Sequence, residues 1–155
     1  MDLSFSRIAL IAVGLAATGA ASAALAHKGA KGIVGERMMM MKHMGDGMKN
    51  LSHMVTGKAP FKANRVESIA TMLKTHAEKI PSQFPKGSLQ KPTEALPVIW
   101  EKWDEFKTQA EALAKLAIEL EGSATTGQAA SLAVFAKIGK SCSACHEVFR
   151  LKKEK

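Results

Sequence analysis

The 155-residue sequence contains no tyrosine and few runs of β-branched residues, which are the residue types that favour strands. It is rich instead in alanine, leucine, methionine, lysine and glutamate, which favour helices. It also lacks an internal repeat, and its length suits one domain with a hydrophobic core. We therefore predict a single all-α domain.

Arrangements of catalytic side chains are lacking too. No serine–histidine–aspartate set and no pair of carboxylates has a spacing that supports hydrolysis. We predict that the protein is not an enzyme. The chain has only two cysteines, Cys142 and Cys145, and they are where chemistry is to be sought.

The first 26 residues predict an export signal. A short start containing Arg7 precedes the apolar stretch 8–21, and small residues allow cleavage after Ala23 or Ala26. This stretch is short for a bilayer span and is interrupted by glycine and threonine, so we expect cleavage and no stable membrane insertion afterwards. Residues 27–155 then form the mature domain, in the periplasm of a Gram-negative-type cell.

The formal net charge is +8, and removing Asp2 and Arg7 with the signal leaves it at +8. A basic surface attracts acidic proteins, anionic lipids or nucleic acid. Export argues against nucleic acid, and the lysines are spread along the chain rather than gathered in one patch. We expect redox proteins of the exported compartment as partners.

Apolar residues at helical spacing predict four helices, over residues 33–55, 64–80, 99–121 and 125 to the C-terminal end. Gly122 is the predicted stop of the third helix, and Thr125 with Gln128 forms a capping-box pattern for the fourth. The proline-rich segment 81–97 is the one long connection. Short links elsewhere predict an antiparallel four-helix bundle. The predicted buried stripe of the first helix is Met41, Met44, Met48, Leu51 and Val55.

Both cysteines belong to a CxxCH pattern, Cys142-Ser143-Ala144-Cys145-His146, in a chain predicted to be exported. On a helix, Cys142 and Cys145 are one turn apart and His146 is four residues after Cys142, so two thiols and one imidazole share a surface. The thiols can add to the two vinyl groups of a haem while the imidazole binds its iron. The pattern therefore predicts one covalently bound haem c.

Other interpretations of the pattern compete with haem. A thioredoxin-like disulfide needs a cysteine pair that opens a helix in a βαβ unit, which this sequence lacks. A zinc site needs four protein ligands and would have to recruit distant histidines. Coincidence is the remaining interpretation, although an exported chain rarely leaves a cysteine pair unused.

Three segments together resemble the class II c-type cytochromes, the cytochrome c′ family. Residues 142–150, CSACHEVFR, resemble that family's C-terminal haem-binding segment. Residues 57–61, GKAPF, look like its link between the first two helices, and residues 95–100, ALPVIW, look like the approach to its third. These segments occur in the family's order and span nearly all of the mature chain.

The resemblance implies a four-helix bundle with haem near one end, His146 as the proximal iron ligand and the first helix on the distal side. The residue facing iron is then Met41, one turn after Arg37, and Arg37 is expected near a haem propionate. Arg150, four residues after His146, is expected on the proximal side. Some family members are monomers and others dimers, so a homodimer is a possible assembly.

The resemblance also implies two alternative functions. Members with an apolar distal residue are five-coordinate, high-spin and bind small gases such as nitric oxide. Members like cytochrome c-556 place a methionine on iron, are low-spin and transfer electrons. Met41 favours electron transfer by a six-coordinate His/Met haem, and gas binding is the alternative. A methionine ligand also denies the open iron position that peroxidase activity requires.

Methionine is more often a flexible core residue than a ligand, and Met38 to Met41 are consecutive. Met40 and Met44 are the alternatives to Met41 as the iron ligand. The mixture of methionines with His43 and His53 also resembles a soft-metal site, which would make the protein a copper-handling one. Helical geometry argues against copper handling, because it places many of these sulfurs inside the bundle.

Overall fold

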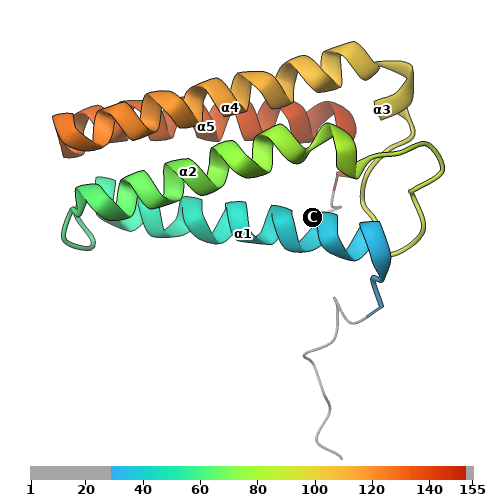
Figure 1. The fold of residues 1–155 in the computed structure, drawn as a ribbon, viewed down its shortest axis with the longest axis horizontal. Coiled ribbons are helices and arrows are strands. Elements are labelled where there is room, and N and C mark those ends of the chain that lie inside the picture. The colour runs from blue at the N-terminus through green and yellow to red at the C-terminus, as the bar shows by residue number, and fades with distance from the viewer. Residues whose placement is uncertain (1–28, 153–155) are drawn as a thin grey trace, which may run out of the picture.

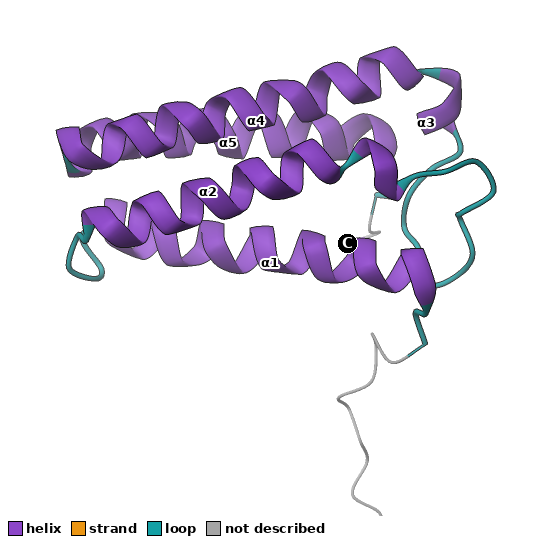
Figure 2. Ribbon diagram, in the orientation of Figure 1, coloured by secondary structure: helices purple, strands orange, loops and turns teal. Residues whose placement is uncertain are grey.

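The computed structural model describes residues 29–152, which form four long helices, a short helix and a 3-10 turn, with no strand among them (Figures 1 and 2). The helices are α1 (Gly32–Val55), α2 (Ala63–Lys79), α3 (Val98–Glu101), α4 (Trp103–Thr126) and α5 (Gln128–Phe149), and the 3-10 turn is η1 (Pro81–Gln83). The all-α prediction is confirmed. The predicted signal peptide lies outside the described residues.

The long helices run alternately up and down, and each packs on two others in the ring order α1, α2, α4, α5 (Figure 1). Their inner faces share one hydrophobic core, as amphipathic helices require. Its largest fully buried apolar side chains are Leu51, Val66, Leu73, Ile99, Leu120 and Ile138. The predicted four-helix bundle is therefore confirmed. Among the described residues, no helix is both long and apolar enough to cross a membrane.

The buried stripe of α1 differs from the predicted one. Met41 and Met48 are only half-buried, so they flank the stripe instead of forming it. The stripe follows the helical repeat, mostly in steps of three or four, and it includes Arg37, a charged residue that hydrophobic spacing alone does not select. Its members are Val34, Arg37, Met40, Met44, Gly47, Leu51, Met54 and Val55.

The predicted boundary between the last two helices is also wrong. α4 continues through Gly122 and Thr125 to Thr126, so Gly122 is no stop and Thr125 is no cap. The break falls at Gly127, whose φ of 113° and ψ of −173° place it in a region that only glycine adopts readily. Gln128 does not complete a capping box, because its side-chain amide donates a hydrogen bond to the Val55 carbonyl of α1 (3.2 Å).

Two buried serines join the helices on either side of this break. Ser123 Oγ of α4 donates to Ser131 Oγ of α5 at 3.1 Å, and Ser131 Oγ lies 3.2 Å from the Ser123 carbonyl. Both serines are buried, and buried hydroxyls need such partners. These hydrogen bonds hold the start of α5 against the end of α4.

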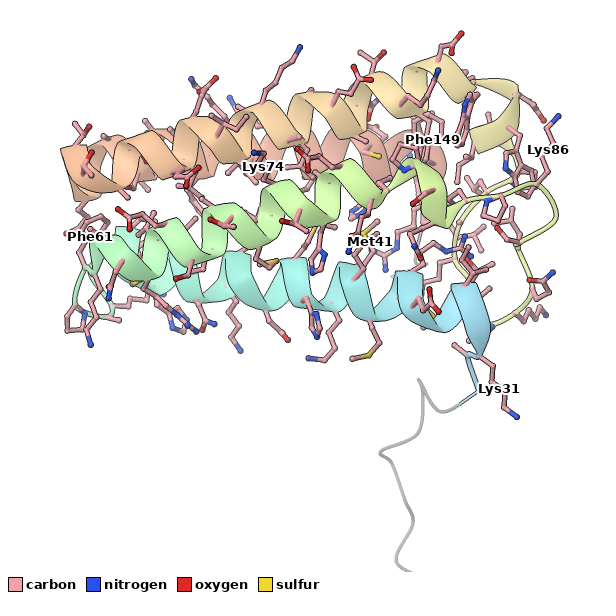
Figure 3. The ribbon with its side chains drawn as sticks, in the orientation of Figure 1. Lys31, Met41, Phe61, Lys74, Lys86 and Phe149 are labelled. Atoms are coloured by element: carbon pink, nitrogen blue, oxygen red, sulfur yellow. The ribbon has the colours of Figure 1, made fainter. Side chains whose placement is uncertain are left out.

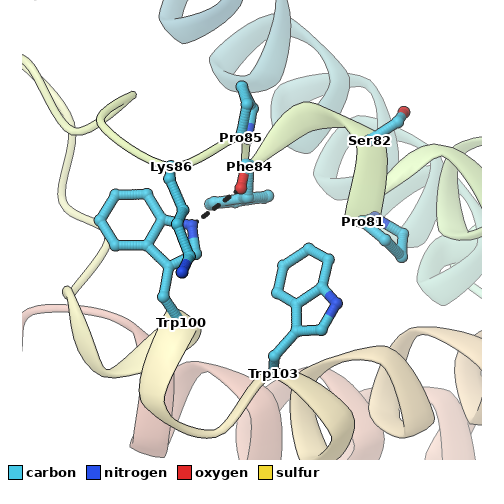
Figure 4. Close-up of a pocket in the computed structure, with 7 residues that line it drawn as sticks. All are labelled: Pro81, Ser82, Phe84, Pro85, Lys86, Trp100 and Trp103. Carbon is cyan, nitrogen blue, oxygen red and sulfur yellow. Dashed lines mark hydrogen bonds between the residues drawn. The ribbon is translucent and has the colours of Figure 1, made fainter.

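The long connection after α2 covers one end of the bundle. The Trp100 indole Nε1 donates a hydrogen bond to the Phe84 carbonyl (2.9 Å), and Phe84, Trp100 and Trp103 line a cavity of about 400 Å³ (Figure 4). The end of the connection pairs with the end of α5, where Leu96 N donates to the Phe149 carbonyl (3.0 Å). The connection is thus an ordered part of the fold.

We predict that Gly127→Ala lowers the free energy of unfolding by about 1–3 kcal/mol, the cost of a side chain in that backbone region. Gly122→Ala is the matched control, since Gly122 is exposed within α4 and an added Cβ meets no atom within 4 Å. Alanine there stabilises by about 0.5–1 kcal/mol. Urea unfolding of both variants measures the difference, and equal stability of the Gly127→Ala variant and the parent would contradict the prediction.

Candidate haem site

Cys142, Cys145 and His146 lie in the last two turns of α5, which ends at Phe149. Both thiols are half-buried against the hydrophobic core, and His146 is exposed beside them. Phe149 is buried and meets Phe106 of α4 edge to face, with 5.1 Å between ring centroids. The packed end of α5 therefore presents two thiols and an imidazole on adjacent turns.

Burial raises the pKa of both cysteines. For Cys145 the pKa rises to about 11, mainly through desolvation, with neighbouring Cys142 and Glu105 adding to the shift. Burial also raises the pKa of Cys142. Redox-active CxxC pairs show the opposite shift, because their function requires a thiolate near neutral pH. The thioredoxin-like interpretation therefore has no support in the structure.

The pKa of His146 is lowered. Although the residue is exposed, atoms packed beside it remove part of its hydration, and the positive charge of Arg150 adds to the effect while Glu94 opposes it. A lowered pKa keeps the imidazole neutral to a lower pH than usual. The neutral ring has the free lone pair that binds a metal ion.

The donor set fits haem better than a bare metal ion. Within residues 29–152, no three or more histidine, cysteine, aspartate or glutamate side chains gather into a group that could hold a metal ion. Cys142, Cys145 and His146 are thus arranged along a helix and do not close around one point, as zinc ligands do. Haem needs the spread arrangement, because the thiols bond the edge of the porphyrin and the imidazole binds its central iron.

Met41 lies on α1, on the side that faces the other helices (Figure 3). Its side chain is half-buried and packs at the edge of the core. Met40 and Met44, the alternative ligands, are core residues with 6% and 8% of their surface exposed. Of these three methionines, Met41 is therefore the one that is not fully enclosed in the core.

Arg37 is buried, with 3% of its surface exposed, and it holds the long connection. Its guanidinium donates to the carbonyls of Gln83 (3.1 Å) and Ser88 (2.8 Å) and to the Ser88 and Thr93 hydroxyls, and it lies 4.2 Å from the Phe84 ring centroid. Desolvation lowers its pKa. The sequence did not predict this role, and the propionate contact remains a prediction.

Arg150 braces the end of α5. Its guanidinium donates two hydrogen bonds to one carboxylate oxygen of Glu94, through Nε at 2.8 Å and through Nη2. Both side chains are 41% exposed, so the pair adds little stability by charge alone. Main-chain hydrogen bonds accompany it, with Leu151 N donating to the Glu94 carbonyl at 2.8 Å. Together these contacts fix the turn that follows His146.

The sequence is similar to those of known c-type cytochromes. The family model described as "Cytochrome C'" matches residues 32–150. Cytochrome c-556 of Agrobacterium tumefaciens (strain II Chrys) is 38% identical over 122 residues, which are 79% of this chain and 99% of that protein. Cytochrome c′ of Pararhodospirillum photometricum is 39% identical over 119 residues, covering 74% of this chain and 92% of the relative.

Solved structures show the same likeness. A variant of Rhodopseudomonas palustris cytochrome c′ has 27% identity and a TM-score of 0.72, covering 79% of this chain and all of that one. A nitric oxide complex of a cytochrome c′ variant from Alcaligenes xylosoxidans has 27% identity and a TM-score of 0.71, covering 78% and 94% of the two chains.

A bundle of four helices whose last helix carries CxxCH defines a c-type cytochrome of the helical class. The family match extends from α1 to the end of α5 and includes the motif. This chain belongs to the cytochrome c′ family, and its cofactor is one covalently bound haem c. The predictions of family and cofactor are confirmed. The roles of the individual residues remain predictions.

We predict that Cys142→Ser combined with Cys145→Ser abolishes covalent attachment, so denaturing electrophoresis followed by haem staining shows no band. Each single variant keeps haem through one thioether. Its ferrous pyridine complex absorbs at longer wavelength than the parent's, because one vinyl group remains conjugated with the porphyrin. Covalent haem in the double variant would contradict the assignment.

We predict that Arg37→Lys lowers the free energy of unfolding by about 1.5–3 kcal/mol, since an ammonium cannot replace the planar fork that holds the connection. Lys42→Ala is the control on the same helix. It removes the ion pair with Asp46, in which both side chains are 57% exposed, and changes stability by less than about 0.5 kcal/mol. Denaturant unfolding compares them, and equal effects would show that Arg37 does not hold the connection.

Proposed function

We propose that the protein is a periplasmic electron carrier with a six-coordinate, low-spin haem. Cys142 and Cys145 attach the cofactor, His146 is the proximal iron ligand and Met41 is the distal ligand. The observation that carries the proposal is the position of Met41, half-buried on the inner side of α1, while Met40 and Met44 are enclosed in the core.

The relatives support the same branch of the family. Several of those with the strongest similarity are named cytochrome c-556, at 34–38% identity and nearly full coverage of two of them. As the resemblance implies, that branch uses a methionine ligand. In this chain Met41 lies one helical turn after Arg37, which places both residues on adjacent parts of α1.

Bound haem supplies a one-electron iron couple, and the protein sets its ligands and surroundings. A histidine and a methionine are both neutral ligands that suit ferric and ferrous iron. Desolvation and the charge of Arg150 lower the pKa of His146, which favours the neutral ring. The half-buried methionine and thiols provide an apolar environment, and the packed end of α5 limits movement. A rigid ligand set suits electron transfer because little rearranges on reduction.

The net charge of the chain suits docking of an acidic redox partner. The net charge of +8 favours association with an acidic protein surface and accelerates encounter at low ionic strength. The export signal expected in residues 1–26 would deliver the chain to the periplasm, where such partners operate. We propose no enzymatic step, since a methionine on iron leaves no position for a substrate.

Optical spectroscopy of the purified holoprotein tests the proposal. We expect low-spin ferric and ferrous spectra and a ferric methionine-to-iron charge-transfer band. Met41→Leu should give a five-coordinate, high-spin spectrum without that band, and it should lower the reduction potential, because methionine ligation raises it. Met48→Leu is the matched control, being half-buried two turns further along α1, and should leave the spectrum unchanged.

A high-spin spectrum in the parent protein would contradict electron transfer by a His/Met haem. It would favour the five-coordinate alternative, for which the nitric oxide complex of a structural neighbour is the precedent. Loss of the charge-transfer band in Met40→Leu or Met44→Leu, with Met41→Leu unaffected, would assign the ligand to the other methionine.

A further inference from the structure

A pair of histidines connects α1 and α2 and has no part in the proposed haem site. His43 of α1 and His76 of α2 lie with their ring centroids 5.9 Å apart and their planes inclined by 25°. His43 is exposed and His76 is half-buried, so solvent reaches the pair from the surface. Sequence spacing could not indicate this pairing, because the two histidines are 33 positions apart in the sequence.

His76 has an unusual ring nitrogen. Its Nδ1 is enclosed by protein and has no hydrogen-bond partner among the described residues. Leaving a buried polar atom without a partner costs about 1–3 kcal/mol, so a group that bonds to the ring there would be favoured. The pKa of His76 is lowered, first by desolvation and then by His43 and Lys79, so the ring favours its neutral form.

A cavity of about 230 Å³ lies along the groove between α1 and α2, and it reaches His43 of the pair. His43 lines it, together with Gly47 of α1 and Met72 of α2. Met72 packs close to the backbone at Gly47, where an added Cβ would lie only 2.5 Å from its terminal methyl. The thioether of Met72 is therefore held in the groove that His43 lines.

Asn50 and Ser68 also line the cavity with neutral oxygen atoms, but imidazole nitrogens are the stronger neutral ligands for a transition metal. Asp46 is paired with Lys42 at 2.6 Å, and that pair is exposed. Arg65 of α2 also lines the cavity, and Lys79 lies one turn beyond His76. A cation bound here therefore needs ligands that bind strongly without carrying charge, which imidazoles do.

The donor chemistry selects copper. Imidazole nitrogens bind copper, nickel and zinc, and among divalent first-row ions copper(II) has the highest affinity for a given set of nitrogen donors. Thioether sulfur is an additional, weaker ligand for copper. We propose that His43 and His76 together bind one copper(II) ion on the outer surface of α1 and α2, with Met72 beside it.

The distance between the rings suits a shared metal ion. Metal–imidazole bonds are about 2.0–2.1 Å long, so two rings bound to one ion are held at about the separation that the pair already has. The stacked rings must turn so that a nitrogen of each points to the ion. The second side-chain torsion of histidine is broad, and the exposed position of His43 leaves room for this rotation.

This site differs from a copper site built on the methionine-rich part of α1. Met40 and Met44 are buried in the core and cannot reach surface copper without unfolding α1. His53, the other histidine of α1, is exposed near the end of the helix, well separated along α1 from His43. The second imidazole comes from α2 instead.

Copper(II) chloride titrated into the ferric holoprotein tests the site, with equilibrium dialysis for stoichiometry and electron paramagnetic resonance for nitrogen ligation. All variants carry His27→Ala, since a histidine near the predicted cleavage sites can bind copper with a terminal amine. We expect one copper per chain with nitrogen hyperfine structure. His43→Ala and His76→Ala should each weaken binding by at least about tenfold, since even outer-shell changes weaken metal sites by 10- to 100-fold.

His53→Ala is the matched control and should bind copper as the parent does. The optical spectrum of the haem verifies in each variant that the bundle is intact, and because His43 is exposed, His43→Ala decides the question if His76→Ala folds poorly. Unchanged binding in His43→Ala, or loss of binding in His53→Ala, would overturn the proposal. The haem spectrum should not change in His43→Ala, so this result is independent of the assignment of Met41.

Discussion

The position of the C-terminal end of α5 determines the proximal side of the haem site, where the covalent attachment is expected. Phe149 packs edge to face on Phe106, and the main chain around it pairs with the end of the long connection. Cys142, Cys145 and His146 are carried in the two turns before this anchor. Three donors on one rigid helix need no loop to bring them together, and loops are the parts that move most. A covalent cofactor held by α5 can therefore be aligned by the packing of that helix alone.

The opposite side of the site depends on a different constraint. The proposed distal ligand lies on α1, and Arg37 connects α1 to the long connection through buried hydrogen bonds. The connection in turn pairs with the end of α5. One arginine thus relates the helix that carries Met41 to the helix that carries His146. A buried guanidinium is costly unless its donors are satisfied, so this position tolerates few replacements.

Much of the fold and of the candidate haem site could be predicted from the sequence. Helical periodicity predicted the four long helices, and CxxCH in a chain expected to be exported predicted haem, because only a few chemistries use that spacing. The register of α1 was less predictable: Met41 and Met48 fit the predicted stripe, yet neighbouring Met40 is the buried residue. Because four methionines are consecutive, hydrophobicity alone does not determine which of them faces inward.

The break between α4 and α5 was predicted at the wrong residue. Thr125 and Gln128 match a capping box, but the helix breaks at Gly127, which lies between them. Arg37 holding the connection and the His43–His76 pair depend on contacts between distant residues, which no local pattern encodes.

Ligation of the haem iron by Met41, opposite His146, is the central proposal. Proton nuclear magnetic resonance of the ferrous holoprotein tests it directly, because the ring current of a low-spin haem shifts the ε-methyl of an iron-bound methionine far upfield. We predict one upfield resonance of three-proton intensity that disappears in Met41→Leu and persists in Met48→Leu. A spectrum without such a resonance, or one that survives replacement of Met41, would contradict the proposed ligand.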